Sequence, residues 1–226
     1  MESFNHNQVA MVASYATSIH RGQYRKSPSG KNNIPYIAHL FDVASILLSA
    51  GASSDEVCAG LLHDAIEDQG GEAQAKNIER MFGSDVRTLV EGCTDSTSTE
   101  PDKKLPWEQR KEAYIKHFET ASDSVRRVSC ADKISNMRAI IADLTKVDDN
   151  EYGNNTWLLF CRSIEHDGKK NTLPLDERRE KVLWYHEEIG KILTTNRVGV
   201  GILADLYDMT FKSLQTAAHA AAVAAR

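Results

Sequence analysis

Apolar residues recur three and four positions apart through most of this chain, and this spacing constrains the fold more than any other feature of the sequence. The clearest stretches are Val43, Ile46 and Leu47; Cys58, Leu61, Leu62, Ala65 and Ile66; and Ile134, Met137, Ile141 and Leu144. In an α-helix, residues at this spacing share one face, which can be buried. The alternating pattern of half-buried strands is missing. The sequence therefore predicts an all-α protein.

Local signals place several helix boundaries. A helix is predicted from near His39 to Gly51, and Ser53-Ser54-Asp55-Glu56 is a capping-box pattern that opens the next helix. The same spacing predicts further helices over about 6–20, 73–91, 108–120, 123–130, 156–166, 176–194 and 199–222. Stretches rich in polar and turn-forming residues predict loops from Ser27 to Ile34, Asp95 to Pro106 and Lys146 to Asn155.

The length fits a single domain. At about 150 residues per domain, 226 residues allow one compact core, and no internal repeat is found. We expect residues 1–195 to form the main body and residues 196–226 to be its C-terminal helix or tail. The alanine-rich end has strong helix propensity but little bulk to bury, so it is expected to fray or to pack on a partner, which leaves homo-oligomerisation open.

Composition and charge narrow the class of partner. Hydrophobic residues at 41% and charged residues at 26% are typical of a folded protein, and no apolar run approaches the ~18 residues of a membrane span. The N-terminus lacks a signal-peptide pattern, so we expect a cytoplasmic protein with no membrane partner. A net charge of −5 argues against nucleic acid as a binding partner. Residues 3–41, however, carry four basic and no acidic residues, which suits a small anionic ligand.

The four cysteines and most histidines suggest structural roles. Cys58, Cys93, Cys130 and Cys161 are far apart in sequence, so we interpret them as reduced, mostly buried thiols. His20 is expected to act as a cap or support. Four further histidines lack a partner pattern and are expected at the surface: His117, His166, His186 and His219. The three tryptophans are expected to anchor the core or loops: Trp107, Trp157 and Trp184.

One stretch is rich in ionisable residues beside a core face. In Leu61-Leu62-His63-Asp64-Ala65-Ile66-Glu67-Asp68, a helix would place His63 one turn before Glu67 and Asp64 one turn before Asp68. A cation would remove the repulsion between these carboxylates, and imidazole and carboxylate groups bind zinc, iron and manganese. A His-Asp pair also arises by accident, and taken alone the stretch favours that interpretation.

Two further sites strengthen the metal hypothesis. His39 follows Pro35-Tyr36-Ile37-Ala38 at the start of a predicted helix, and Asp132 lies one helical turn before Asn136 in Cys130-Ala131-Asp132-Lys133-Ile134-Ser135-Asn136-Met137-Arg138. This combination resembles the HD-type metal-dependent phosphohydrolases. The Glu67-Asp68 extension is similar to that of the hydrolase domain of RelA/SpoT homologues, including the small animal-type enzymes.

The resemblance covers roughly residues 6–194 and implies a fold, a cofactor and a site. It implies a single all-α HD-domain helical bundle and one Mn²⁺ ion per chain, held by His39, His63, Asp64 and Asp132, with catalysis assisted by Glu67 and Asp68. It further implies removal of the 3′-pyrophosphate from the stringent-response alarmone ppGpp, or from ppApp, giving the 5′-nucleotide and pyrophosphate.

The chemistry of the residues agrees with this resemblance. Two nitrogens and two carboxylates leave about two positions open on a six-coordinate ion for water and a phosphate oxygen. Arg25, Lys26 and Lys133 could offset phosphate charge, and Asn136 suits the ribose or a phosphate edge. Relative to the animal-type pattern, about three residues are inserted within Lys31 to Ile34, so the sequence leaves the choice between guanine and adenine open.

Two alternatives remain from the sequence. The chain could be another nucleotide phosphatase, such as one acting on the 2′-phosphate of NADPH. It could also be a catalytically silent HD module that binds an alarmone as a sensor.

Overall fold

The structure is a bundle of helices, as the spacing of apolar residues predicts. The computed structural model describes residues 3–26, 34–94, 105–146, 153–160, 165–166, 169–170 and 173–224. The elements are α1 (His6–Ile19), α2 (Ile37–Ser49), α3 (Ser54–Leu62), α4 (Ala65–Gln69), α5 (Gly71–Phe82), α6 (Ser84–Cys93), α7 (Trp107–Thr120), α8 (Asp123–Leu144), the 3₁₀ helix η2 (Gly153–Leu159), β1 (Glu165–His166), β2 (Lys169–Lys170), α9 (Leu175–Thr195), α10 (Arg197–Val200) and α11 (Ile202–Ala224). The two short strands pair antiparallel. The other elements of the described residues are helices, so the predicted all-α class is confirmed.

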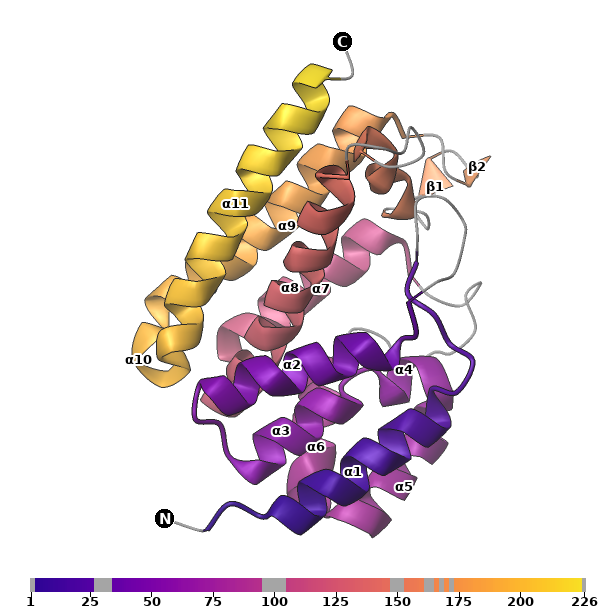
Figure 1. The fold of residues 1–226 in the computed structure, drawn as a ribbon, viewed down its shortest axis with the longest axis vertical. Helices are drawn as coiled ribbons and strands as arrows, with labels where there is room; N and C mark the ends of the chain where they lie inside the picture. Colours follow the sequence, from indigo (N-terminus) through magenta and orange to yellow (C-terminus); the bar gives the residue numbers. More distant parts are fainter. Residues whose placement is uncertain are drawn as a thin grey trace.

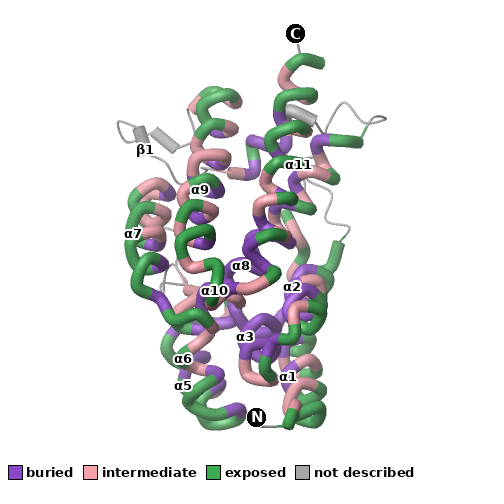
Figure 2. Tube along the Cα trace, turned by 90° about the vertical axis from the view of Figure 1, so that its left-hand side faces the viewer, coloured by how far each residue is buried: buried purple, intermediate pink, exposed green. Residues whose placement is uncertain are grey.

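Helix α8 joins the two halves of the molecule. Helices α1 to α6 lie in the half that holds the N-terminus, and α7, α9 and α11 lie in the other half (Figure 1). Helix α8 packs against α2, α3 and α6 on one side and against α9, α10 and α11 on the other. Its middle is buried, whereas α7 and α9 each expose one face (Figure 2). A residue in the middle of α8 is thus held from both halves.

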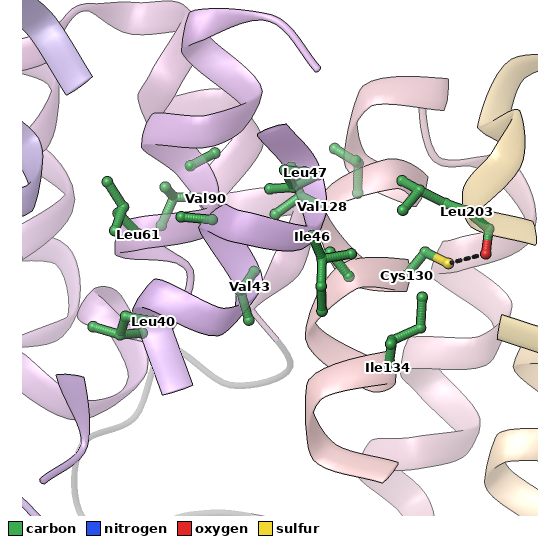
Figure 3. Packing of buried hydrophobic residues seen from close by; sticks show 14 of the residues in the cluster. Leu40, Val43, Ile46, Leu47, Leu61, Val90, Val128, Cys130, Ile134 and Leu203 are labelled. Carbon is green, nitrogen blue, oxygen red and sulfur yellow. Dashed lines mark hydrogen bonds between the residues drawn. The ribbon is translucent and has the colours of Figure 1, made fainter. Parts of the chain in front are cut away.

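The core runs from α2 and α3 across α8 to α11. Leu47 and Leu61 are almost fully buried, as are Val128 and Ile134 of α8 (Figure 3). The Cys130 thiol donates to the carbonyl oxygen of Leu203 at 3.4 Å, so α8 and α11 approach closely. Burial raises the pKa of the Cys58 thiol to about 12. Cys58 and Cys130 are free and buried, as expected, whereas Cys93 is half-buried and Cys161 lies outside the described residues.

The capping box predicted at Ser53 is present. The Ser53 hydroxyl accepts from the backbone N–H of Glu56, and the Glu56 carboxylate accepts from the backbone N–H of Ser53. Helix α2 ends at Ser49, and Gly51 follows with a φ of 67°, which a glycine adopts without strain. The predicted helix boundaries around residue 50 are therefore confirmed.

Several other predicted boundaries are wrong. The helix predicted over 73–91 is two helices, because Gly83 breaks it with a φ of 98°. The apolar stretches before and after residue 131 form one continuous helix, α8, rather than a helix that ends at Cys130. The helix predicted over 156–166 is wrong, because among its described residues the end of η2 covers 156–159 and β1 covers 165–166. Periodicity detects helical segments but not the glycine conformations and tight turns that divide them.

The C-terminal segment is part of the bundle. Leu214 and Ala218 of α11 are buried, and α11 packs against α8 and α9. The expectation that His186 is a surface residue is wrong. It is buried, burial lowers the pKa of its imidazole to about 3, and its Nδ1 lies 3.2 Å from the Tyr207 hydroxyl. His117 and His219 are exposed as expected, and the His166 side chain lies outside the described residues.

The Arg127 side chain of α8 contacts three neighbouring segments, and we expect its replacement to destabilise the fold. Its Nε lies 3.2 Å from the carboxylate of Glu56, and its guanidinium donates to the carbonyl oxygens of Ala50 and Val200. Arg127→Met leaves the buried Glu56 carboxylate without its cation. We expect the free energy of unfolding to fall by about 3 to 5 kcal/mol in urea denaturation.

Arg87→Met is the matched control for this prediction. Arg87 contacts exposed carboxylates of Glu72, Glu79 and Glu91 at the surface, where solvent screens ion pairs. Its replacement should change stability much less. Equal losses in the two variants would contradict the role given to Arg127.

Candidate metal centre

Three elements bring two histidines and an aspartate together. His39 lies in the first turn of α2, while His63 and Asp64 fill the two-residue break between α3 and α4. The expectation of one continuous helix through this stretch is wrong. The backbone nevertheless stays in the right-handed region at both residues, and the Asp68 N–H donates to the Asp64 carbonyl at 2.9 Å. Asp64 and Asp68 are therefore one turn apart, as the sequence predicts.

The ligand atoms of these residues converge. Suitable atoms of His39, His63 and Asp64 all lie within 4.8 Å of one another. The two Nε2 atoms are 3.3 Å apart, and Asp64 Oδ2 is 3.0 Å from His63 Nε2. Asp132 of α8 completes the cluster, since its Oδ1 lies 3.2 Å from His39 Nε2 and 3.4 Å from His63 Nε2.

The other ring nitrogen of each histidine makes its own hydrogen bond. His63 Nδ1 donates to the Gly60 carbonyl oxygen at 2.8 Å, and His39 Nδ1 lies 3.0 Å from the Ser135 hydroxyl. A proton on Nδ1 leaves the Nε2 lone pair free to bind a cation. Both imidazoles are almost fully buried, so each ring is fixed before a cation binds.

Electrostatics in the cluster also suit a cation. Burial alone would lower the pKa of His63, but the carboxylates of Asp64 and Asp132 outweigh burial, and the pKa is well above its ordinary value. Burial raises the pKa of Asp132, but Lys133 and His63 outweigh it and hold that pKa well below its usual range. Burial also raises the pKa of Asp64, but His63 outweighs it and holds that pKa below its usual range, so two ionised carboxylates face the imidazoles. A divalent cation can replace the imidazole proton as their counter-charge.

Comparison with known proteins agrees with this geometry. The family model described as HD domain matches residues 13–160. The chain belongs to the HD-domain family. An HD domain implies a divalent metal ion, and the His-His-Asp cluster has the donor set to hold one.

Relatives of this HD domain include two proteins named guanosine-3′,5′-bis(diphosphate) 3′-pyrophosphohydrolase MESH1. The Xenopus tropicalis protein is 38% identical over 129 residues, which cover 56% of this chain and 66% of that relative, just under two thirds of its length. The Homo sapiens protein is 38% identical over 133 residues, 58% of this chain and 68% of that relative.

Two solved structures share the helical architecture. One, described as a metazoan ortholog of SpoT that hydrolyzes ppGpp, matches with a TM-score of 0.65 over 93% of this chain and 97% of that chain. Its identity is 23%, so this match shows the fold alone. A Listeria monocytogenes protein matches with a TM-score of 0.58 and 27% identity over 80% of this chain and 95% of that chain.

Within the HD domain, Lys133 and Asn136 both contact Asp132. Lys133 Nζ lies 2.6 Å from Asp132 Oδ2 and 5.1 Å from the centre of the Tyr114 ring. Asn136 Nδ2 donates to Asp132 Oδ1 at 2.6 Å, and Arg25 Nη2 donates to Asn136 Oδ1 at 3.1 Å. The structure thus places two predicted substrate contacts, Lys133 and Asn136, beside the predicted metal ligand Asp132.

The remaining predicted site residues lie on α4 and at the end of the basic segment. Glu67 is half-buried and Asp68 is exposed, both on the short helix α4. Lys26 is exposed at the end of the basic segment, and the Asp64 side chain is 24% exposed, so the cluster can be reached from solvent. The inserted residues Lys31 to Asn33 lie outside the described residues.

Two further residues were missed from the sequence as parts of the site. The Tyr36 hydroxyl donates to Asp64 Oδ2, and Ser135 contacts His39. Ser135 follows Asp132 by three residues in α8, so helical spacing could have placed both on one face. Tyr36 and Asp64 belong to separate segments, and no local pattern links them.

Ser135→Ala should weaken metal binding while leaving all four proposed ligands in place. The hydroxyl contacts the ring nitrogen of His39 that faces away from the cluster, and such outer contacts are worth about 10-fold to 100-fold in metal affinity. A manganese titration followed by calorimetry measures the change. Ser213→Ala is the control, because Ser213 bonds only the preceding turn of α11 among the contacts described. An unchanged affinity in Ser135→Ala would contradict the role of this hydroxyl.

Proposed function

We propose that the chain is a manganese-dependent hydrolase that removes the 3′-pyrophosphate from guanosine or adenosine alarmones. The observation that carries this proposal is the convergence of His39, His63, Asp64 and Asp132 in a chain with relatives named guanosine-3′,5′-bis(diphosphate) 3′-pyrophosphohydrolase. The products are the 5′-nucleotide with a free 3′-hydroxyl and pyrophosphate.

The donor set supports manganese as the ion. Two imidazole nitrogens and two carboxylate oxygens fit Mn²⁺, whereas Mg²⁺ prefers oxygen ligands and bound water. Four protein ligands leave about two positions on a six-coordinate ion. When bound, the ion lowers the pKa of a water molecule and polarises the phosphorus that the water attacks.

Two carboxylates of α4 can accept the proton that the attacking water loses. Asp68 lies one turn beyond the ligand Asp64, and Glu67 is its neighbour. Either carboxylate can orient the attacking water and accept the proton that the water loses. The bond between the 3′-oxygen and phosphorus breaks, and the 3′-oxygen takes up a proton as the hydroxyl.

Basic residues hold the substrate. Arg25 and Lys26 belong to residues 3–41, which contain four basic and no acidic residues, so they suit the negatively charged phosphates. Lys133 and Asn136 contact Asp132, so we assign them to substrate contacts made beside that ligand. Among the described residues, no helix is both long enough and apolar enough to cross a membrane.

The proposal is tested by product identity. The purified chain is incubated with Mn²⁺ and with ppGpp, ppApp or NADPH in separate reactions, and products are identified by chromatography and mass spectrometry. We expect pyrophosphate from ppGpp or ppApp. Inorganic phosphate from NADPH alone would make the chain a 2′-phosphatase. Tight binding of ppGpp without any product would make it a sensor module.

A further inference from the structure

Gln23 connects the end of α1 to a carboxylate beside the metal cluster. Its Nε2 donates to Asp68 Oδ2 at 2.7 Å. Its Oε1 accepts from Gln69 Nε2 at 2.6 Å and lies 2.7 Å from His20 Nδ1. His20 is buried, and its ring stacks on that of Tyr36 with the ring centres 5.4 Å apart. The amide of Gln23 therefore connects the turn that follows α1 to α4.

Only one orientation of this amide satisfies its neighbours. Asp68 presents carboxylate oxygens, which need a donor, and Gln69 presents an NH₂ group, which needs an acceptor. A reversed amide would set oxygen against oxygen at Asp68 and NH₂ against NH₂ at Gln69. The contact with Gln23 Oε1 likewise requires a proton on His20 Nδ1. Three hydrogen bonds thus fix both the position and the direction of the Gln23 side chain.

The backbone of Gln23 is also held. Its N–H donates to the His20 carbonyl at 3.0 Å, and its carbonyl accepts from the Tyr36 N–H at 2.9 Å. The tight turn places Gly22 at a φ of 78°, which favours glycine. Gln23 is therefore anchored in a turn and by the segment that leads into α2.

We propose that Gln23 is a positioning residue that sets the orientation of the Asp68 carboxylate for hydrolysis. Asp68 is exposed on a helix of five residues, and an exposed aspartate samples several rotamers. The bond from Gln23 holds Asp68 Oδ2 and so favours one of these rotamers. This inference rests on the proposed function, because it assigns a support to a carboxylate of that reaction.

The test is a double-mutant cycle with two replacements of Gln23. Gln23→Met keeps the length of the side chain and removes its hydrogen bonds. Gln23→Glu keeps acceptors for His20 and Gln69 but sets a second carboxylate against Asp68. Each is made alone and with Asp68→Asn, and initial rates of pyrophosphate release from ppGpp are measured with saturating Mn²⁺. Gln74→Met is the control, since buried Gln74 donates to the Tyr15 hydroxyl on α1 and contacts none of the proposed site residues in the bonds described.

We expect each Gln23 variant to lower kcat by about 10-fold to 100-fold, as the loss of a hydrogen bond to a charged group does, with KM changed less than about 3-fold. In the Asp68→Asn background the same replacements should change kcat less than about 2-fold, because the carboxylate they act on is gone. Gln74→Met should keep the parent kcat, and all variants should bind Mn²⁺ with the parent stoichiometry.

Three outcomes would overturn the inference and leave the proposed function intact. They are an unchanged kcat in both Gln23 variants, equal effects with and without Asp68→Asn, and a rise in KM alone, which would make Gln23 a substrate contact. If the parent chain releases no pyrophosphate from either alarmone, the proposed function fails, and the inference fails with it. Activity of the parent chain therefore separates the two failures.

Discussion

Replacing His63 by alanine should remove metal binding and turnover together. His63 Nε2 lies within 3.4 Å of candidate ligand atoms on His39, Asp64 and Asp132, so this ring sits at the centre of the cluster. Without it, the carboxylates of Asp64 and Asp132 lose their shared counter-charge. Because the ion supplies several kcal/mol of transition-state stabilisation, we expect kcat/KM to fall by more than about 10³-fold.

Metal analysis and chelation check this prediction. His63→Ala should contain far less than one manganese per chain, whereas His219→Ala, which changes an exposed histidine of α11, should keep both metal and activity. Excess chelator should abolish turnover of the parent chain, and Mn²⁺ should restore it better than Mg²⁺. Full activity in excess chelator would rule out a metal-dependent reaction at this cluster.

Glu67→Gln and Asp68→Asn should lower kcat by about 10²-fold to 10⁴-fold while the metal stays bound. These carboxylates lie on α4, which begins directly after the proposed ligand Asp64, and loss of a group that accepts a proton in the transition state has this magnitude. Amide replacements keep size and shape, so the fold should be unaffected. Steady-state kinetics and manganese content are measured on the same preparations.

The matched control for these variants is Glu72→Gln. Glu72 is an exposed carboxylate of α5 that contacts Lys76 and Arg87, and its replacement should leave kcat unchanged. Loss of manganese in Glu67→Gln or Asp68→Asn would make that residue a metal ligand and contradict its assignment to proton transfer.

The sequence predicted those parts of the molecule that depend on local periodicity and on a contiguous motif. The helical class, the capping box at Ser53 and the one-turn separation of Asp64 and Asp68 all follow from residue spacing, and the structure confirms them. The four proposed metal ligands come from segments up to 93 residues apart in sequence, from His39 to Asp132. Their common location was predicted only through the family resemblance, because spacing along a chain cannot bring separate helices together.

Features that depend on tertiary packing were not predicted. His186 has no local partner, and its burial results from the approach of α9 and α11. The break after Leu62 also escaped detection, because the apolar stripe continues from Leu61 through Ala65 as though one helix ran across it. The contacts of Gln23 and Ser135 join segments 45 and 96 residues apart. No local pattern links Gln23 to Asp68 or Ser135 to His39 across these separations.

Metal binding at the proposed centre and the stability of the whole bundle are thermodynamically coupled through helix α8. The helix that carries Asp132 also packs against both halves of the molecule, so α8 cannot open locally without exposing the main core. A ligand that binds only the folded chain stabilises it by RT ln(1 + L/Kd), where L is the free ligand concentration. Metal binding would thus raise the stability of the folded chain as well as the fraction of chains that can react, so the ion concentration should change the unfolding midpoint together with the rate.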